Sequence, residues 1–564
     1  MSKYVIIGGV AGGASAAARL RRLDEKAEII LLERGEHISY ANCGLPYYLG
    51  GVIQERDRLF VQTPEGFGGR FRIDVRVNHE VVRINPGDHS LEIRDLRNDR
   101  LYTEQYDKLV LSPGAEPIRP GIPGINDPAI YTLRNVMDID RIQQHLEKRH
   151  PRHAVVVGAG FIGLEMAENL NHRGVSVTIV EMAEQVMTPL DYEMAAEVHQ
   201  HLKTKQVEFY LKDGVSSFER RDHKIMIHLQ SGRIIPTDLV ILSIGIRPES
   251  RLAKEAGLEL GPRGGIKVNA FLQTSNPDIY GVGDAIEYPD PLTGESSLTY
   301  LAGPANKQGR MAADNIVVGN TREYHGSIHT AIAKVFDLTV ASCGLSEKTL
   351  RRIGMPYQAS IIHASSHAGY YPDATPLSLK IVFAPETGRL LGAQMIGYQG
   401  IDKRIDVLST MIRHQATVYE LTELEHAYAP PYSSAKDPVQ MAGYVAENIL
   451  QGRVNIIHWH QISRLDPAEN LLLDVRTPEE FRLGTIEGAL NIPVDELRSR
   501  LAELPRDRRI VVFCGVGLRG YLACRILVQH GFTSAVNLSG GYKTYQHVTQ
   551  KQSNEDIFAG DVIA

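Results

Sequence analysis

The sequence is poor in cysteine, in long apolar runs and in excess positive charge, and each shortage excludes a class of protein. Four cysteines in 564 residues are too few for a disulfide-stabilised secreted scaffold. The 67 aspartates and glutamates outnumber the 61 lysines and arginines, which argues against a nucleic-acid-binding surface. No apolar stretch approaches the length of a bilayer span, and the chain opens on a strand pattern rather than a secretory signal. We therefore expect a soluble, cytoplasmic protein without nucleic-acid or membrane partners.

A glycine-rich turn follows the first apolar run of the chain. Residues 4–7 predict a strand, Gly8–Gly13 a tight turn, and the alanine-rich stretch after them a helix. A second strand ends at Glu33, twenty residues after Gly13. This spacing is typical of a dinucleotide fold: the glycines admit a pyrophosphate at a helix N-terminus, and the acid binds ribose hydroxyls. Val10 replaces the usual middle glycine, so a purely structural turn remains the alternative.

The same unit recurs with every glycine present. Residues 154–157 predict a strand, Gly158–Gly163 the turn, and the next strand ends at Glu181. Two such units indicate two dinucleotides, a resident flavin and a diffusing nicotinamide. Glu181 would accept hydrogen bonds from a ribose diol and repel a 2′-phosphate, which favours NADH over NADPH. The alternative is a duplicated fold that binds no ligand.

Two of the four cysteines lie in motifs that indicate sulfur chemistry. Cys43 stands in the segment Ser39–Tyr48, shortly after the first glycine-rich turn, with no second cysteine nearby. A solitary redox cysteine must hold its oxidised state as a mixed disulfide, a persulfide or a sulfenic acid. The alternative is a buried structural cysteine, which is also our expectation for Cys343 and Cys524.

Cys514 follows the apolar strand pattern of residues 510–513 and opens a loop that ends at Arg519. A cysteine at a strand end, followed by glycines and a helix, sits in a ring of backbone N–H groups that stabilises an anionic sulfur. The loop is one residue shorter than in related phosphatases, which favours a single sulfane sulfur over a tetrahedral phosphate. A phosphatase remains the alternative for this loop.

Several further segments resemble the two-dinucleotide flavoprotein disulfide reductases over about residues 1–447. They are Leu111–Gly114, Leu242–Gly245 and Thr274–Asp284. Within that family, the segments around Gly8–Gly13, Ser39–Tyr48 and Ala427–Pro438 resemble the coenzyme A-disulfide reductases. Residues 459–550 resemble a rhodanese domain in Leu471–Phe481, Gly488–Pro493 and Asn537–Tyr542, with Thr485 in place of the usual histidine.

The resemblance implies an α/β fold with two dinucleotide-binding (Rossmann-like) domains, an α+β dimerisation domain and a C-terminal rhodanese-like α/β domain. The expected boundaries are 1–150 with 270–323 for the FAD-binding domain, 151–269 for the NADH-binding domain, 324–448 for the dimerisation domain and 459–564 for the rhodanese domain. The short connection at 450–458 predicts a rhodanese domain that is docked or on a limited tether. A homodimer with FAD, NADH and coenzyme A, and with no metal, is expected.

The resemblance also assigns site residues. Cys43, Cys514, Tyr370 and Tyr428 are expected to be catalytic, with the two tyrosines reaching Cys43 of the other subunit. Those expected at FAD are Gly8, Val10, Ala11, Gly12, Gly13, Glu33, Arg34, Asn42, Cys43, Val81, Ser112, Pro113, Gly114, Arg134, Asp284, Ala302 and Tyr428. Those expected at NADH are Gly158, Gly160, Phe161, Ile162, Gly163, Glu165, Glu181 and Gly245. Those expected at coenzyme A are Ser15, Arg19, Arg22, Ser39, Asn42, Gln62, Phe71, Tyr370, Tyr428 and Lys436. The rhodanese loop consists of Gly515, Val516, Gly517, Leu518 and Arg519.

Phe71 departs from the basic residue expected at its position, and Arg70 and Arg72 flank it. The predicted activity is reduction by NADH, through FAD and Cys43, of coenzyme A disulfide, a persulfide or polysulfide, while Cys514 carries sulfane sulfur. One alternative is an NADH oxidase or peroxidase that cycles Cys43 through sulfenic acid. Another is a sulfurtransferase in which Cys514 hands on sulfur and the flavin domain only senses redox state.

Overall fold

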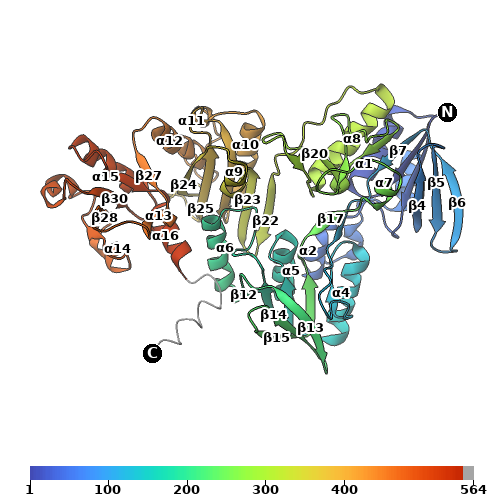
Figure 1. Cartoon of the computed structure of the whole chain (residues 1–564), viewed down its shortest axis with the longest axis horizontal. Helices are drawn as coiled ribbons and strands as arrows, with labels where there is room; N and C mark the ends of the chain where they lie inside the picture. The colour runs from blue at the N-terminus through green and yellow to red at the C-terminus, as the bar shows by residue number, and fades with distance from the viewer. Residues whose placement is uncertain (551–564) are drawn as a thin grey trace. The chain divides into compact units, whose positions relative to one another are not determined.

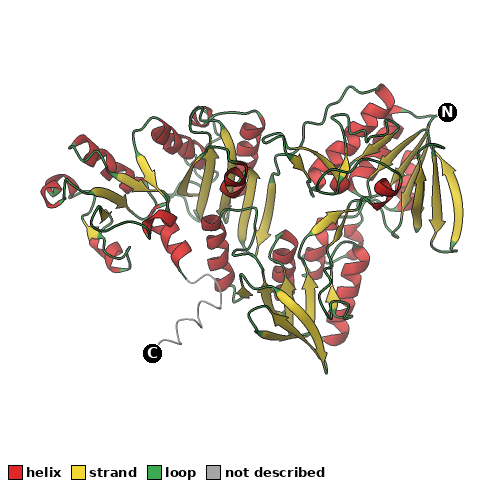
Figure 2. Cartoon of the chain, in the orientation of Figure 1, coloured by secondary structure: helices red, strands yellow, loops and turns green. Residues whose placement is uncertain are grey.

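The computed structural model describes residues 1–550, which form two compact units. The first unit consists of Met1–Met182 and Asp213–Ser327; the second consists of Ala183–Lys212 and the chain from Ile328 onward. Helices and strands alternate through most of the described chain (Figure 1, Figure 2). Residues 551–564 of the predicted rhodanese domain lie outside the described residues.

The first unit is built on a five-stranded sheet whose paired strands are all parallel. In spatial order its strands are β19 (Ile279–Gly281), β7 (Lys108–Leu111), β1 (Lys3–Ile7), β2 (Glu28–Glu33) and β3 (Asp74–Val77). The inner strands are apolar and buried along almost their whole length, as expected for a parallel sheet covered on both faces.

Helices α1 (Ala11–Leu23) and α8 (Ala302–Val318) pack against each other beside this sheet. Their backbones approach so closely that a Cβ at Gly309 would lie 2.1 Å from the carbonyl oxygen of Gly12. A glycine on α8 therefore fixes the distance between the two helices, and with it the wall that α8 presents to the first glycine-rich turn.

A second parallel sheet follows the second glycine-rich turn. Its strands in the first unit are β11 (Ser176–Val180), β10 (His153–Val157), β16 (Leu239–Leu242) and β9 (Ile130–Tyr131). The helices of this region are α4 (Val136–Arg149) and α5 (Phe161–His172), whereas α7 (Arg251–Glu255) packs against β4 (His79–Asn85). The two strand–turn–helix units predicted from the glycine spacing are confirmed.

Smaller sheets and short helices complete the first unit. The antiparallel sheets are β4 (His79–Asn85), β5 (Ser90–Asp95) and β6 (Arg100–Gln105), and β13 (Val215–Arg221), β14 (Lys224–Leu229) and β15 (Ile234–Thr237). The remaining elements are β8 (Ala115–Pro117) with β17 (Ile246–Pro248), β18 (Ile266–Lys267), β20 (Ile286–Pro289), β21 (Ser296–Ser297), α2 (Leu45–Leu49), α3 (Pro64–Phe71) and the short 3₁₀ turns η1 (Asn42–Gly44), η2 (Arg56–Leu59) and η3 (Gly283–Ala285).

The second unit begins with an antiparallel sheet that is covered by helices. In spatial order its strands are β22 (Ala331–Val335), β23 (Leu338–Gly344), β26 (Leu390–Gly397), β25 (Pro376–Phe383) and β24 (Gln358–Ser365). Its helices are α9 (Glu347–Ile353), α10 (Ile401–Arg413), α11 (Val418–Thr422) and α12 (Pro438–Leu450), together with α6 (Tyr192–Thr204), which precedes β12 (Glu208–Tyr210). The expected α+β domain is confirmed.

The C-terminal domain, coloured orange to red in Figure 1, contains a parallel five-stranded sheet. Its strands are β27 (Asn455–Ile457), β31 (Val536–Leu538), β30 (Arg509–Phe513), β28 (Asn470–Asp474) and β29 (Leu490–Asn491). Its helices are α13 (Trp459–Ile462), α14 (Pro478–Arg482), α15 (Leu518–Gln529) and α16 (Gly541–Thr549), with 3₁₀ turns η4 (Leu497–Ser499) and η5 (Leu501–Glu503).

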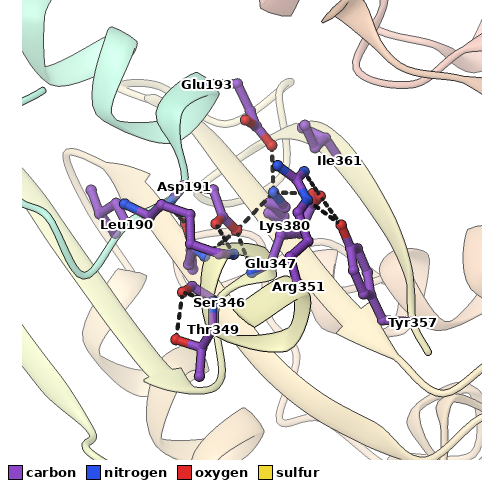
Figure 3. A network of polar contacts seen from close by, with 12 residues as sticks. Leu190, Asp191, Glu193, Ser346, Glu347, Thr349, Arg351, Tyr357, Ile361 and Lys380 are labelled. Carbon is purple, nitrogen blue, oxygen red and sulfur yellow. Dashed lines mark hydrogen bonds and ion pairs between the residues drawn. The ribbon is translucent and has the colours of Figure 1, made fainter. Parts of the chain in front are cut away.

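A buried lysine ties α6 to the antiparallel sheet (Figure 3). Lys380 on β25 is fully buried and forms ion pairs with Asp191 at 2.8 Å, with Glu347 at 2.5 Å, and with Glu193. The three carboxylates lie close enough together to hold a metal ion, but the lysine ammonium supplies the compensating charge there. Glu193 also accepts a hydrogen bond from the indole of Trp459, so the network extends to the first helix of the C-terminal domain.

The C-terminal domain is docked on the antiparallel sheet rather than loosely tethered. The backbone N–H of Ile361 donates to the hydroxyl of Ser539 at 3.2 Å, and His363 bonds the hydroxyl of Thr544 at 2.8 Å. Ser539 directly precedes Gly540, the N-cap of α16, and Thr544 lies in the first turn of that helix. Of the two arrangements that the short connection allowed, the structure shows the docked one.

None of the helices in residues 1–550 combines the length and the apolar character needed to cross a bilayer.

Candidate functional site

The first glycine-rich turn has the geometry that its sequence predicts. Gly8 has a φ of +96°, and a Cβ there would lie 2.1 Å from the carbonyl oxygen of Ser112, so only glycine fits. The turn leads directly into α1, and the first residues of that helix, Ala11 and Gly12, line a cavity. Glu33 accepts a hydrogen bond from the backbone N–H of Gly9 at 2.9 Å, which fixes the carboxylate beside the turn.

A cavity of about 680 Å³ opens at this turn; we call it the cofactor cavity. It gathers most of the residues predicted to hold FAD, from eight separate segments of the first unit. These lining residues are Gly8, Val10, Ala11, Gly12, Glu33, Arg34, Asn42, Cys43, Val81, Ser112, Pro113, Gly114, Arg134, Asp284 and Ala302. Gly13 is buried in α1 below the cavity, and the predicted contact Tyr428 belongs to the second unit.

The residues of the cofactor cavity fit a flavin dinucleotide. Its volume lies within the range of pockets that enclose small ligands. The carboxylate of Asp284 lines this cavity and receives no hydrogen bond from the described residues. Burial raises the pKa of that carboxyl to about 6. A half-buried acceptor without a donor suits a ligand rich in hydroxyl groups, such as a ribitol chain.

The second glycine-rich turn repeats the same construction. Gly158 has a φ of +100°, and a Cβ there would lie 2.2 Å from the carbonyl oxygen of Ser243. Glu181 accepts a hydrogen bond from the N–H of Ala159 at 2.7 Å. The predicted NADH residues lie at this turn (Gly158, Gly160), on the first two turns of α5 (Phe161, Ile162, Gly163, Glu165), at the end of β11 (Glu181) and after β16 (Gly245). Ile162 also lines the cofactor cavity, so the helix that follows the second turn contributes to that cavity.

Cys43 lies in the wall of the cofactor cavity and remains accessible to solvent there. The 3₁₀ turn η1 presents it, just before α2. Loss of solvation raises the pKa of the Cys43 thiol, and the nearby carboxyls of Glu165 and Asp284 raise it further. Burial also raises the pKa of Glu165 itself, to about 7. The other three cysteines belong to the second unit, so Cys43 is the sole thiol of the unit that contains it.

A second cavity of about 380 Å³ lies along α1; we call it the α1 cavity. Five of the residues predicted to bind coenzyme A line it, namely Ser15, Arg22, Ser39, Gln62 and Phe71. Val10 and Ala11 line both this cavity and the cofactor cavity, so the two are neighbours. Asn42 lines the cofactor cavity instead.

The cations of the α1 cavity differ from those that the sequence predicted. Arg19 does not line it and instead forms an ion pair with Asp314 at 2.6 Å. Arg310, from α8, lines the cavity beside Arg22, and so does Asn306, which accepts a hydrogen bond from Ser15 at 2.5 Å. Sequence reasoning missed both α8 residues because they lie almost 300 positions from α1 and no local motif marks them.

The Cys514 loop lies between β30 and α15, and its cysteine is fully buried. The N–H of Gly517 donates to the sulfur of Cys514 at 3.1 Å, and Gly517 has a φ of +107°, which a glycine adopts readily. Two backbone N–H groups at the start of α16 donate hydrogen bonds to carbonyl groups of the loop. Tyr542 donates to the carbonyl of Cys514 at 2.7 Å, and Lys543 to the carbonyl of Gly515 at 2.9 Å.

Other residues of the predicted C-terminal site have structural partners. Thr485, at the position of the usual histidine, donates to Asp474 at 2.8 Å, and Asp474 in turn pairs with Arg476. Cys343 and Cys524 are buried, as predicted, and burial raises the pKa of the Cys524 thiol to about 12. Both therefore remain protonated thiols at neutral pH.

Three predicted site residues, Tyr370, Tyr428 and Lys436, are exposed on the second unit. Tyr370 is 76% exposed and Tyr428 47%, and their hydroxyls are hydrogen-bonded to each other at 2.7 Å. Two large aromatic side chains left in solvent but paired with each other form a preorganised polar feature rather than part of a core.

Comparison with known families divides the chain into three parts. Residues 2–309 match the family described as pyridine nucleotide-disulphide oxidoreductase. Residues 330–438 match the dimerisation domain of the same family, and residues 460–547 match the rhodanese-like domain.

Individual proteins resemble larger parts of the chain. A coenzyme A disulfide reductase of Staphylococcus haemolyticus is 36% identical over 449 residues, which cover 80% of this chain and all of the relative. The crystal structure of reduced Bacillus anthracis CoADR-RHD superposes with a TM-score of 0.95 at 53% identity and covers 97% of this chain and 98% of its own. A NAD-dependent persulfide reductase from A. fulgidus superposes with a TM-score of 0.91 at 39% identity over 96% of this chain and all of its own.

Proposed function

Because the chain belongs to the pyridine nucleotide-disulphide oxidoreductase family, we propose that it passes electrons from NADH through FAD and Cys43 to coenzyme A disulfide or a persulfide. The observation that supports this most directly is the solitary Cys43 thiol in the wall of the cofactor cavity. Enzymes with a cysteine pair store electrons in an internal disulfide; a single thiol has to form its disulfide with the substrate. The names of the Staphylococcus and A. fulgidus relatives agree with both substrate classes.

The residues of the first unit have distinct tasks in this scheme. When bound, FAD supplies two-electron transfer between NADH and sulfur. The N-terminus of α1 and the glycines of its turn would receive the pyrophosphate, while Glu33 and Asp284 would accept hydrogen bonds from hydroxyl groups. Glu181 favours the ribose diol of NADH over a 2′-phosphate.

Substrate binding is assigned to the α1 cavity. Arg22 and Arg310 supply positive charge for the phosphates of coenzyme A, and Ser39 and Gln62 supply polar contacts. The shared wall at Val10 and Ala11 allows a long thin ligand to begin in the α1 cavity and end at Cys43.

The sulfur chemistry at Cys43 balances with one molecule of NADH. The Cys43 thiolate attacks one sulfur of the disulfide, forms a mixed disulfide with it and releases the other half as a thiolate. Two electrons from NADH then cleave the mixed disulfide and regenerate Cys43. A persulfide follows the same course, with sulfide as one of the products. We assign to Cys514 the carriage of sulfane sulfur as a persulfide.

We further propose that the enzyme is a cytoplasmic homodimer. The match to a dimerisation domain and the exposed pair Tyr370–Tyr428 support an arrangement in which these tyrosines act at Cys43 of the other subunit. There, a tyrosine hydroxyl would donate a hydrogen bond to the departing thiolate.

The test is Cys43→Ser in flavin-loaded enzyme. We expect NADH-dependent reduction of coenzyme A disulfide and sulfide release from coenzyme A persulfide to fall by at least about a thousandfold. NADH should still bleach the flavin, because the dinucleotide sites are intact. Cys514→Ser is the matched control and should retain coenzyme A disulfide reduction. Turnover of either substrate at the wild-type rate by Cys43→Ser would overturn the proposal, as would turnover with oxygen or peroxide alone.

A further inference from the structure

The positive charge of the Cys514 loop is neutralised by a neighbouring helix. Arg519 ends the loop, and both of its terminal nitrogens bond the two carboxylate oxygens of Glu480 on α14, each at 2.6 Å. This two-point geometry is the strongest that an arginine and a carboxylate form. Glu480 is itself held at the first turn of α14, where it accepts a hydrogen bond from the N–H of Thr477 at 3.0 Å.

Glu480 keeps its negative charge across the working range of pH. The hydrogen bonds from Arg519 lower the pKa of the Glu480 carboxyl to about 2. The guanidinium is therefore matched by a full opposite charge at neutral pH, and the pair presents little net charge to a ligand at the loop.

A second cation near the loop, Arg476, is matched as well. Arg476 pairs with the buried Asp474 at 2.6 Å. The loop residues Gly515 to Leu518 are uncharged, so the cation that interacts with Cys514 is Arg519, whose charge Glu480 offsets.

The mouth of the loop is apolar. Leu518 is 59% exposed and Val516 42%, and on the adjoining helix Leu522 is 46% exposed. Apolar side chains in these positions favour a donor with a carbon-rich carrier over a small hydrated anion.

We propose that Cys514 takes sulfane sulfur from organic persulfides in preference to thiosulfate, and that Glu480 sets this preference by neutralising Arg519. This inference rests on the proposed role of Cys514 as a sulfur carrier. With a persulfide, the Cys514 thiolate attacks the outer sulfur of R–S–S–H, the S–S bond breaks, and R–S⁻ leaves as Cys514–S–S–H forms. The reacting sulfur atoms together carry one negative charge throughout.

With thiosulfate as donor, the loop has to accommodate more negative charge. The thiolate and the thiosulfate dianion together bring three negative charges, and the departing sulfite keeps two of them. Stabilising that charge requires a free cation at the loop, and the Arg519–Glu480 pair does not provide one. Glu480 thus acts as a positioning residue on Arg519 and not on the sulfur itself.

The experiment measures thiocyanate formation by the full-length enzyme with cyanide as the common acceptor, and with thiosulfate or glutathione persulfide as donor. The wild type should have the higher kcat/KM with the persulfide. Glu480→Gln frees the charge of Arg519 and should raise kcat/KM for thiosulfate about tenfold while it changes the persulfide value less than about twofold. The gain should shrink as salt increases, because it is electrostatic.

Glu479→Gln is the matched control. Glu479 lies on the same turn of α14 but pairs with Arg482, and both side chains are more than 70% exposed. This variant has the same change in net charge and should leave both donors unaffected. The double variant Glu480→Gln/Arg519→Gln should lose the gain with thiosulfate, which separates freed charge from a disturbed loop.

Two results would overturn the inference: a wild-type preference for thiosulfate, or an unchanged donor ratio in Glu480→Gln. Failure of the underlying role looks different. If Cys514→Ser still transferred sulfur from both donors, Cys514 would not be the carrier, whatever the donor ratio. Loss of both activities in Cys514→Ser, together with the shifted ratio in Glu480→Gln, supports the carrier and its selectivity at once.

Discussion

Cys43 is surrounded by acceptors of protons rather than by cations. Burial, Glu165 and Asp284 all raise the pKa of its thiol, and a backbone hydrogen bond only partly opposes them. In the described chain, the polypeptide by itself therefore favours the protonated thiol at neutral pH. The thiolate that attacks a disulfide has to be favoured by what binds beside it, which makes the reactivity of Cys43 sensitive to each neighbouring charge.

Glu165→Gln tests this sensitivity. The pKa of Glu165 is about 7, so the side chain is largely neutral below that pH and ionised above it. Only the ionised form repels the Cys43 thiolate, and removing it should lower the pKa of Cys43. We expect iodoacetamide to alkylate Cys43 of the holoenzyme several-fold faster in Glu165→Gln at pH 8, with little difference at pH 6. Glu147→Gln, on α4, is the control; equal acceleration at both pH values would contradict the electrostatic explanation.

Single residues were predictable from the sequence where a local motif fixes them. Gly8, Gly158 and Cys43 follow from spacing within a few positions, because the turn geometry admits only particular residue types. The partners Arg310 and Glu480 were not predictable, because each reaches its site through tertiary packing of a helix that has no motif of its own. Arg19 was assigned to the ligand for the same reason: its partner Asp314 lies 295 positions away.

At the scale of elements, α16 connects the Cys514 loop to the rest of the second unit. Its N-terminal N–H groups bond the carbonyls of Cys514 and Gly515, and its side chain Thr544 bonds His363 on β24. His363 in turn bonds Ser378, which donates to Glu197 on α6 at 2.5 Å. A chain of hydrogen bonds therefore runs from α6 through the antiparallel sheet to the helix behind the Cys514 loop.

His363→Ala should loosen this docking. The substitution leaves the hydroxyls of Thr544 and Ser378 without their shared partner in a buried site, which costs about 1–3 kcal/mol. We expect faster hydrogen exchange in α16 and faster proteolysis between residues 451 and 458, with slower sulfur transfer at Cys514. Coenzyme A disulfide reduction should be unchanged.

The same histidine gives the docking a pH dependence. Burial lowers the pKa of His363 from its usual 6.5 to about 3. A group whose folded pKa is depressed takes up a proton more readily when undocked, so docking weakens as the pH falls from 6.5 towards 3. His363→Ala should remove this contribution from the hydrogen-exchange profile. His414→Ala, an exposed position after α10, is the control, and identical exchange in α16 of the wild type and His363→Ala would show that the histidine does not hold the domain.

The sequence predicted the individual strands and helices better than it predicted which of them pack together. Both parallel sheets with glycine-rich turns, and the C-terminal parallel sheet, follow from buried apolar runs that end in glycines. The position of α6 does not follow: by sequence it belongs to the predicted NADH-binding domain, yet it packs within the second unit through Glu193 and Glu197. In the sequence, these two acids are indistinguishable from the polar face of an ordinary exposed helix. Only the fold brings Lys380 and His363 close to them.

For the molecule as a whole, the exposed tyrosines lead us to predict an active site that is shared between the two subunits of a dimer. The hydroxyls of Tyr370 and Tyr428 bond each other, and the described chain leaves 76% of the first residue and 47% of the second exposed. If they complete the site of the other subunit, each active site takes Cys43 from one chain and the tyrosines from its partner. A defect in Cys43 and a defect in the tyrosines would then be separable between subunits.

Mixed dimers test this arrangement. Cys43→Ser should be inactive, and Tyr370→Phe/Tyr428→Phe should reduce coenzyme A disulfide about a hundredfold more slowly, because the departing thiolate loses its donor. Unfolding and refolding an equimolar mixture of the two variants should restore about a quarter of wild-type activity, since half of the dimers are hybrids and each hybrid has one intact site. Each variant refolded alone is the control. If the tyrosines acted on Cys43 of their own chain, every site in the hybrid would keep one defect, and mixing would restore nothing.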